Sequence, residues 1–107
     1  MIVNITKKTI ISKKYYRLKN LEKISGLIGR KQKVVVFKTR FGIHTFLLKS
    51  PIDVIVLDKY SKAVILKCSL KPNRIFLWNI KYDTVIELPE NYIKNSKTEL
   101  NDFLKVS

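Results

Sequence analysis

Three side chains in the middle of the chain are of the types that general acid–base chemistry needs. They are the single histidine, His44, and two carboxylates set in apolar segments, Asp53 and Glu87. His44 could act as an acid or a base, with either carboxylate as its orienting partner. Two carboxylates on facing strands could also cleave a glycoside if their separation were suitable. No serine or cysteine stands in a nucleophile motif, so the sequence leaves catalysis open and favours a non-catalytic role.

Three more ionisable residues, Arg30, Lys49 and Asp102, join these because they match the family motifs described below, and five of the six lie inside or beside apolar segments. An unpaired charge is costly in such surroundings. One interpretation is structural: the charges pair with one another or cap backbone groups, and Glu87 pairs with Lys49 or Arg30. The other is a small-molecule or carbohydrate pocket around His44 and Glu87. We favour the structural interpretation and keep the pocket as the alternative.

The stretch from 41 to 58 positions two of these residues. Apolar residues occupy both faces of its second half, 52–57, which predicts a central strand covered on two sides. Pro51 cannot donate to a ladder, so it fits the start of this strand or a bend. Residues 58–62 fit a hairpin turn into a return strand over 63–70.

The return strand holds the single cysteine, Cys68, on one alternating face with Val64 and Leu66. We therefore expect Cys68 to be a small core residue. The predicted core consists of Val54, Ile55, Val56, Leu57, Val64, Leu66 and Trp78.

Shorter apolar runs predict further strands at 2–6, 34–38, 74–81, 84–88 and 103–106. Apolar residues at helical spacing predict one short helix over 18–28, which Gly26 and Gly29 end. A helical turn is expected near Tyr92. The predicted fold is a single mainly β domain over 1–107, an antiparallel barrel or roll of about seven strands with one short N-terminal helix.

Several short motifs resemble those of the family called domain of unknown function 192. They are HTF followed by an apolar pair, Lys49 and PIDVIVLD; a Gly-Leu-x-x-Arg element at 26–30; LKPNRI; VIELP; and Ser96, Thr98 and Asp102 near the end. The order and spacing of these motifs over 21–106 carry the resemblance. It implies a mostly β fold with no settled activity, and it marks six polar positions: Arg30, His44, Lys49, Asp53, Glu87 and Asp102.

This chain departs from the family pattern at two asparagines. The family usually places glycine near Asn91 and again at Asn101. Both positions are predicted to need a left-handed backbone, which asparagine tolerates better than other non-glycine residues. We therefore expect both turns to form.

Composition limits the remaining possibilities. The 107 residues fit one domain, and lysines break the N-terminal apolar residues too often for a signal peptide or a membrane span. A single cysteine excludes an internal disulfide and favours a reducing compartment, so we expect a cytoplasmic protein. One histidine and one cysteine do not complete a metal ligand set, so no metal or cofactor is expected.

The net charge of +14 is concentrated at one end. Residues 1–40 hold twelve Lys or Arg against one acid, a net +11, whereas 41–107 hold ten against seven, a net +3. This pattern predicts a basic face for an anionic partner, RNA or DNA held through phosphate contacts. Tyr15 and Tyr16 could add stacking. The candidate residues are Lys7, Lys8, Lys13, Lys14, Arg17, Lys31, Lys33, Lys38 and Arg40. The competing explanation is coding bias, since lysine outnumbers arginine eighteen to four.

Overall fold

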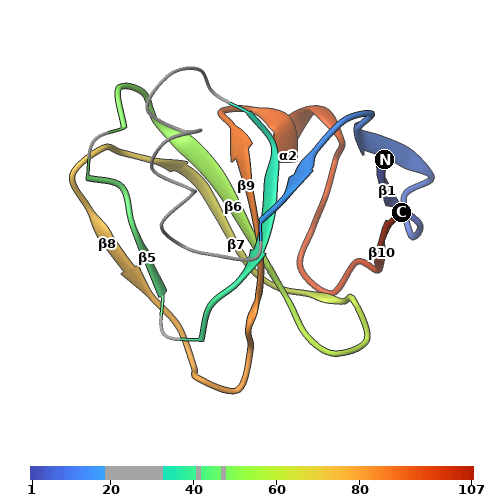
Figure 1. The fold of residues 1–107 in the computed structure, drawn as a ribbon. Coiled ribbons are helices and arrows are strands. Elements are labelled where there is room, and N and C mark those ends of the chain that lie inside the picture. Colours follow the sequence, from blue (N-terminus) through green and yellow to red (C-terminus); the bar gives the residue numbers. More distant parts are fainter. Residues whose placement is uncertain (19–32, 41, 47) are drawn as a thin grey trace.

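The computed structural model describes residues 1–18, 33–40, 42–46 and 48–107, and within them the chain is mainly β (Figure 1). Its elements are β1 (Ile2–Asn4), β2 (Thr9–Ser12), β3 (Tyr16–Arg17), β4 (Val35–Lys38), β5 (Gly42–His44), β6 (Ile52–Leu57), β7 (Ala63–Leu70), β8 (Ile75–Leu77), β9 (Thr84–Pro89), α2 (Tyr92–Asn95) and β10 (Leu104–Val106). The strands form three sheets, ordered β10-β1-β2, β3-β4-β9-β6-β7 and β5-β8. The mainly β prediction is confirmed. A single closed barrel of about seven strands is not, because these sheets do not close on one another.

The five-stranded sheet is the middle layer of the molecule. The smaller sheets lie on either side of it, β1 and β10 at one end and β5 and β8 at the other (Figure 1). Every residue of β6 is buried, as its two-sided apolar sequence predicts. The pairing of β3 with β4 is parallel, and the other pairings within this sheet are antiparallel.

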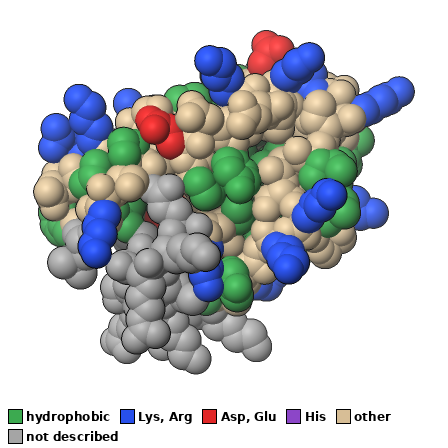
Figure 2. Space-filling model, turned by 90° about the horizontal axis from the view of Figure 1, so that it is seen from above, with side chains coloured by type: hydrophobic (Ala, Val, Ile, Leu, Met, Phe, Trp, Pro, Cys, Tyr) green, Lys and Arg blue, Asp and Glu red, His purple; other side chains and the backbone are tan. Residues whose placement is uncertain are grey.

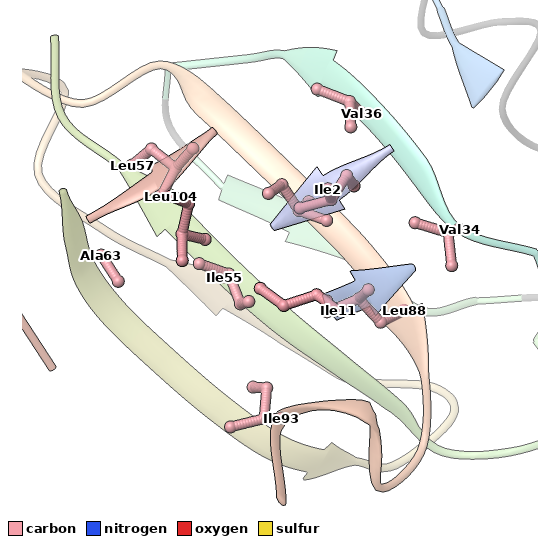
Figure 3. Close-up of a cluster of buried hydrophobic side chains, with 11 residues drawn as sticks. Ile2, Ile11, Val34, Val36, Ile55, Leu57, Ala63, Leu88, Ile93 and Leu104 are labelled. Atoms are coloured by element: carbon pink, nitrogen blue, oxygen red, sulfur yellow. The ribbon is translucent and has the colours of Figure 1, made fainter. Parts of the chain in front are cut away.

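Each face of the middle sheet packs against its own apolar core. The first core lies between this sheet, the three-stranded sheet and α2 (Figure 3). It comprises Ile2, Ile11, Val34, Val36, Ile55, Leu57, Ala63, Ile86, Leu88, Ile93 and Leu104. The second core lies between the opposite face and the two-stranded β5–β8 sheet, and it comprises Val35, Phe37, Ile43, Ile52, Val54, Val56, Leu70 and Val85.

The predicted return strand has the bounds that the sequence indicates, but Cys68 is exposed rather than buried. Two register shifts against β6 break the strict alternation of β7. As a result Val64 packs against the second core and Leu66 against the first. Lys67, Cys68 and Ser69 lie where the register with β6 shifts near the end of β7, and all three are exposed. The prediction of a buried Cys68 is therefore wrong.

Other local predictions have mixed outcomes. Asn91 and Asn101 both have left-handed backbones, with φ of 78° and 72°, as predicted. The helical turn near Tyr92 is α2. The strand expected over 74–81 is shorter, because β8 ends at Leu77 and Trp78 turns to donate from Nε1 to the Tyr82 carbonyl at 2.9 Å. The predicted helix over 18–28 falls almost wholly outside the described residues.

Candidate functional site

Asp53 is a structural acceptor. It is buried on the face of β6 that meets the first core. Its Oδ1 accepts from the Ser69 amide at 3.0 Å, and its Oδ2 accepts from the Ile93 amide at 2.9 Å. One carboxylate thus satisfies a backbone donor in the irregular end of β7 and another in α2. This arrangement matches the structural interpretation of the buried charges.

Asp102 is also buried and joins the two ends of the chain. Its carboxylate accepts from Asn4 Nδ2, from Lys7 Nζ and from the Glu99 amide, each at 2.9 Å. Burial opposes the ionisation of Asp102, but the hydrogen bonds from Asn4, from the Glu99 amide and from Lys7 together lower its pKa. Thr98 Oγ1 extends the network by accepting from Asn4 at 3.0 Å.

Lys7 belongs to this network rather than to a free basic surface. Its ammonium lies 2.9 Å from the Asp102 carboxylate and 3.1 Å from that of Glu99. The hydrogen bonds to Asp102 and Glu99 raise its pKa. We therefore remove Lys7 from the candidate anion-binding residues, because its charge is already neutralised within the protein.

Glu87 is the buried carboxyl with the least support. It lies opposite Val35 on β4 and Val54 on β6, on the face that meets the second core. Its Oε2 is buried, and it has no hydrogen-bond partner among the residues that the structure describes. Burial raises the pKa of Glu87 to about 7.

Of the two partners predicted for Glu87, one is described by the structure. Lys49 is exposed and makes no ion pair within the described ranges, whereas the predicted pairing with Arg30 lies outside them. The cross-strand row through Glu87 carries Tyr16 at one end and Lys67 at the other, each separated from it by a valine. Glu87 is therefore a protonatable group in an apolar layer.

The structure does not bring His44, Asp53 and Glu87 into one site. Asp53 pairs with Leu88 whereas Glu87 pairs with Val54, so the two carboxylates project from opposite faces of the middle sheet. His44 is exposed, and it alternates with Ile43, which faces the second core. The imidazole instead stacks on Phe46 with 4.8 Å between ring centroids. Neither the acid–base pair nor the glycosidase pair that the sequence left open is formed.

On the face that Figure 2 shows, the described basic side chains are scattered rather than gathered in one patch. Lys8 lies in the turn between β1 and β2, whereas Lys38 ends β4 and Arg40 follows it. Arg40 lies 3.8 Å from Asp83. Lys31 is outside the described residues. The distribution weakens the expectation of a single N-terminal basic face.

The remaining basic candidates do lie near one another along the edge strand β3. Lys13 and Lys14 precede this strand, Arg17 is in it, and Lys33 precedes its partner β4. The Lys33 ammonium lies 4.8 Å from the centroid of the Tyr16 ring, and the Arg17 guanidinium lies 5.9 Å from that of Tyr15. We call Lys13, Lys14, Tyr16, Arg17 and Lys33 the β3 basic edge.

One feature that sequence patterns missed is the outward side of the two-stranded β5–β8 sheet. Ile75 and Leu77 remain 64% and 69% exposed although they lie in a strand. The alternation in the sequence places Ile75 and Leu77 on the opposite face from Phe76, but only the packing of β8 against the second core shows that the face of Phe76 is the covered one.

Two absences hold for the described part of the chain. No group of three His, Cys, Asp or Glu side chains there could hold a metal ion. No helix there is long and apolar enough to cross a membrane.

No protein-family model matches the chain, and no curated protein does either. Among solved structures, a protein of unknown function from Novosphingobium aromaticivorans is similar, with a TM-score of 0.73, 12% identity, and coverage of 86% of this chain and 74% of that one. A second, from Sinorhizobium meliloti 1021, is described as a candidate transcription regulator; its TM-score is 0.69 at 14% identity, covering 85% of this chain and 79% of that one. At these identities the similarity establishes the fold alone.

Proposed function

We propose that the chain is a non-catalytic binding module that holds nucleic acid by its phosphates along the β3 basic edge. One observation carries the proposal: the Tyr16 ring is 46% exposed on an edge strand, with the Lys33 ammonium beside it. Lys13, Lys14 and Arg17 extend the positive charge along the chain. None of these cations makes an ion pair with a carboxylate within the described ranges.

This arrangement suits a flexible nucleic acid strand. Lysine and arginine neutralise phosphates and release counterions, which supplies affinity without reading sequence. An exposed aromatic ring beside a cation offers a base a surface to stack on. The description of the Sinorhizobium meliloti protein as a candidate transcription regulator agrees with a nucleic-acid partner, but a likeness in fold carries no function.

The test is a fluorescence titration with a mixed-sequence RNA at two salt concentrations. Reversing Lys13, Lys14 and Arg17 to Glu should lower both the affinity and its salt dependence. The matched control reverses three exposed lysines elsewhere, Lys94, Lys97 and Lys105. Equal losses in both triple variants, or no binding by the unmodified protein at low salt, would reject the proposal and leave coding bias as the explanation of the charge.

A second pair of variants tests the aromatic ring. Tyr16→Ala should weaken binding severalfold, because base–aromatic stacking contributes to affinity. Tyr60→Ala is the control. Tyr60 is 68% exposed and has the Lys59 ammonium 5.1 Å from its ring centroid, but it lies in the turn between β6 and β7 and not on β3. Equal effects of the two changes would show that Tyr16 has no special part.

The second candidate function is the binding of a small molecule at Glu87, because the buried Oε2 of its carboxyl has no hydrogen-bond partner among the described residues. Of the two residues predicted to form this site, only Glu87 remains a candidate, because His44 projects from the outward side of the β5–β8 sheet. A ligand with a hydrogen-bond donor, such as an amine or a sugar hydroxyl, would supply the partner that Oε2 lacks. Such a ligand should raise the melting temperature of the unmodified protein and leave that of Glu87→Gln unchanged.

We also infer that the chain belongs to the domain of unknown function 192 family. Two of the polar positions that match the family motifs hold the fold together here, because the buried carboxylates of Asp53 and Asp102 each accept two or more hydrogen bonds. Asn91 and Asn101 have left-handed backbones where that family has glycine. Asn101→Gly should therefore preserve or slightly raise the melting temperature, whereas Asn101→Ala should lower it.

A further inference from the structure

The outward side of the two-stranded β5–β8 sheet is an exposed apolar surface. We call Phe46, Ile75, Leu77 and the stacked His44 the outer β5–β8 face. Phe46 is 45% exposed, and the two aliphatic side chains are more exposed still. His44 pairs with Ile75 across this sheet, so the side chains stand next to one another rather than singly.

Local structure holds this face in place. Ile43 and Phe76 pair across the β5–β8 sheet and face inward to the second core, so their neighbours along each strand face outward. Gly42 pairs with Leu77 and has a φ of 152°, which L side chains rarely adopt. A Cβ at Gly42 would come within 2.8 Å of Leu77 Cδ2, so Leu77 lies directly over the glycine.

Positive charges predominate in the segments that form and flank this face, and the first acidic residue after them, Asp83, lies 3.8 Å from Arg40. The segments 44–50 and 71–81 contain Lys49, Lys71, Arg74 and Lys81 and no acidic residue. All four side chains are exposed, and none makes an ion pair with a described carboxylate. The face therefore fits a partner that is apolar and anionic at once.

We propose that the outer β5–β8 face docks the protein on the surface of an anionic lipid bilayer. Ile75, Leu77 and Phe46 would enter the boundary between headgroups and acyl chains, and the neighbouring cations would contact lipid phosphates. The β5–β8 sheet stands at one end of the molecule (Figure 1), so a flat surface can reach it without meeting the middle sheet. Nucleic acid fits this face less well, because isoleucine and leucine offer no stacking surface for bases.

The experiment is co-sedimentation with phosphatidylcholine vesicles, with and without about one third phosphatidylglycerol, a fraction that gives a strongly anionic surface. The unmodified protein should sediment with the anionic vesicles and stay in solution with the neutral ones. The double variant Ile75→Ser and Leu77→Ser should bind at least about tenfold less. The control variant Ile5→Ser and Ile10→Ser removes two apolar side chains that are each 52% exposed in and beside the three-stranded sheet, and it should bind normally.

A second measurement does not depend on any variant folding. Trp78 is the single tryptophan, directly after Leu77. Lipids brominated in their acyl chains should quench its fluorescence if the outer β5–β8 face enters the bilayer. No sedimentation with anionic vesicles, no quenching, or equal losses in the two double variants would overturn the proposal. It would also fail if light scattering showed a dimer that Ile75→Ser and Leu77→Ser dissociates, because a second copy would then occupy the face.

Discussion

The burial of Glu87 should make the stability of this protein fall as the pH rises from acid to neutral. An ordinary glutamate has a pKa of 4.5, and burial raises that of Glu87 to about 7. The folded protein therefore holds a proton that the unfolded chain has released over this range. Linkage then requires the free energy of unfolding to decrease between pH 4.5 and about 7. Below this window both states are protonated, and above it both are ionised, so this contribution becomes constant.

The size of the effect follows from the two pKa values. A difference from 4.5 to about 7 corresponds to about 3 kcal/mol of stability at full ionisation. For a domain of this size that is a change of roughly 10–20 °C in melting temperature. Glu87→Gln removes the titration but still buries an amide, which has its own cost of about 1–3 kcal/mol. The pH dependence, rather than the stability at one pH, is therefore the informative quantity.

The assay is urea denaturation of the unmodified protein and of Glu87→Gln from pH 4.5 to pH 8, a range that spans the window above. The difference between the two curves should grow in favour of the variant as the pH rises and level off above pH 7. Glu90→Gln serves as the control, because Glu90 is only partly buried and lies in the turn after β9. Parallel curves for Glu87→Gln and the unmodified protein would refute the reasoning and indicate that Glu87 is compensated in solution.

Three further predictions test the layers and their connections. Val56→Ala should lower the free energy of unfolding by roughly 1–3 kcal/mol in chemical denaturation, because Val56 is fully buried in the second core; hydrogen exchange should find β6 among the most protected segments. Gly42→Ala should lower the melting temperature and alter Trp78 fluorescence, since the new Cβ would collide with the Phe76 carbonyl oxygen. Asp102→Asn should destabilise the protein by about 2–4 kcal/mol at neutral pH. Because the folded state lowers the pKa of Asp102, that difference should shrink as the pH falls below its ordinary value of 3.8.

Patterns within a few residues of the sequence were sufficient to predict β6, the turn into β7 and the two left-handed asparagines. The two-sided apolar run after Pro51 predicts β6, and the turn before Ala63 predicts the hairpin to β7 with its correct bounds. Asn91 and Asn101 are left-handed, as expected of asparagine where a glycine is usual. These features follow from steric preferences and from the burial of a strand, which act over a few residues. The short strands β2 and β3 had no such signal and were missed.

The candidate site depended on pairings that no local rule determines. The pairing register in the middle sheet places Asp53 on one face and Glu87 on the other, and a shift of β9 by one residue would turn Glu87 to the face of Asp53. Cys68 was misplaced because irregular register in an edge strand breaks the alternation that the prediction assumed. His44 was separated from both carboxylates by the third layer of the fold. The sequence by itself determined which residues are apolar, charged or able to turn, because those are properties of single side chains. Only the tertiary structure decided which charges meet, because strand register and layer packing are properties of the whole chain.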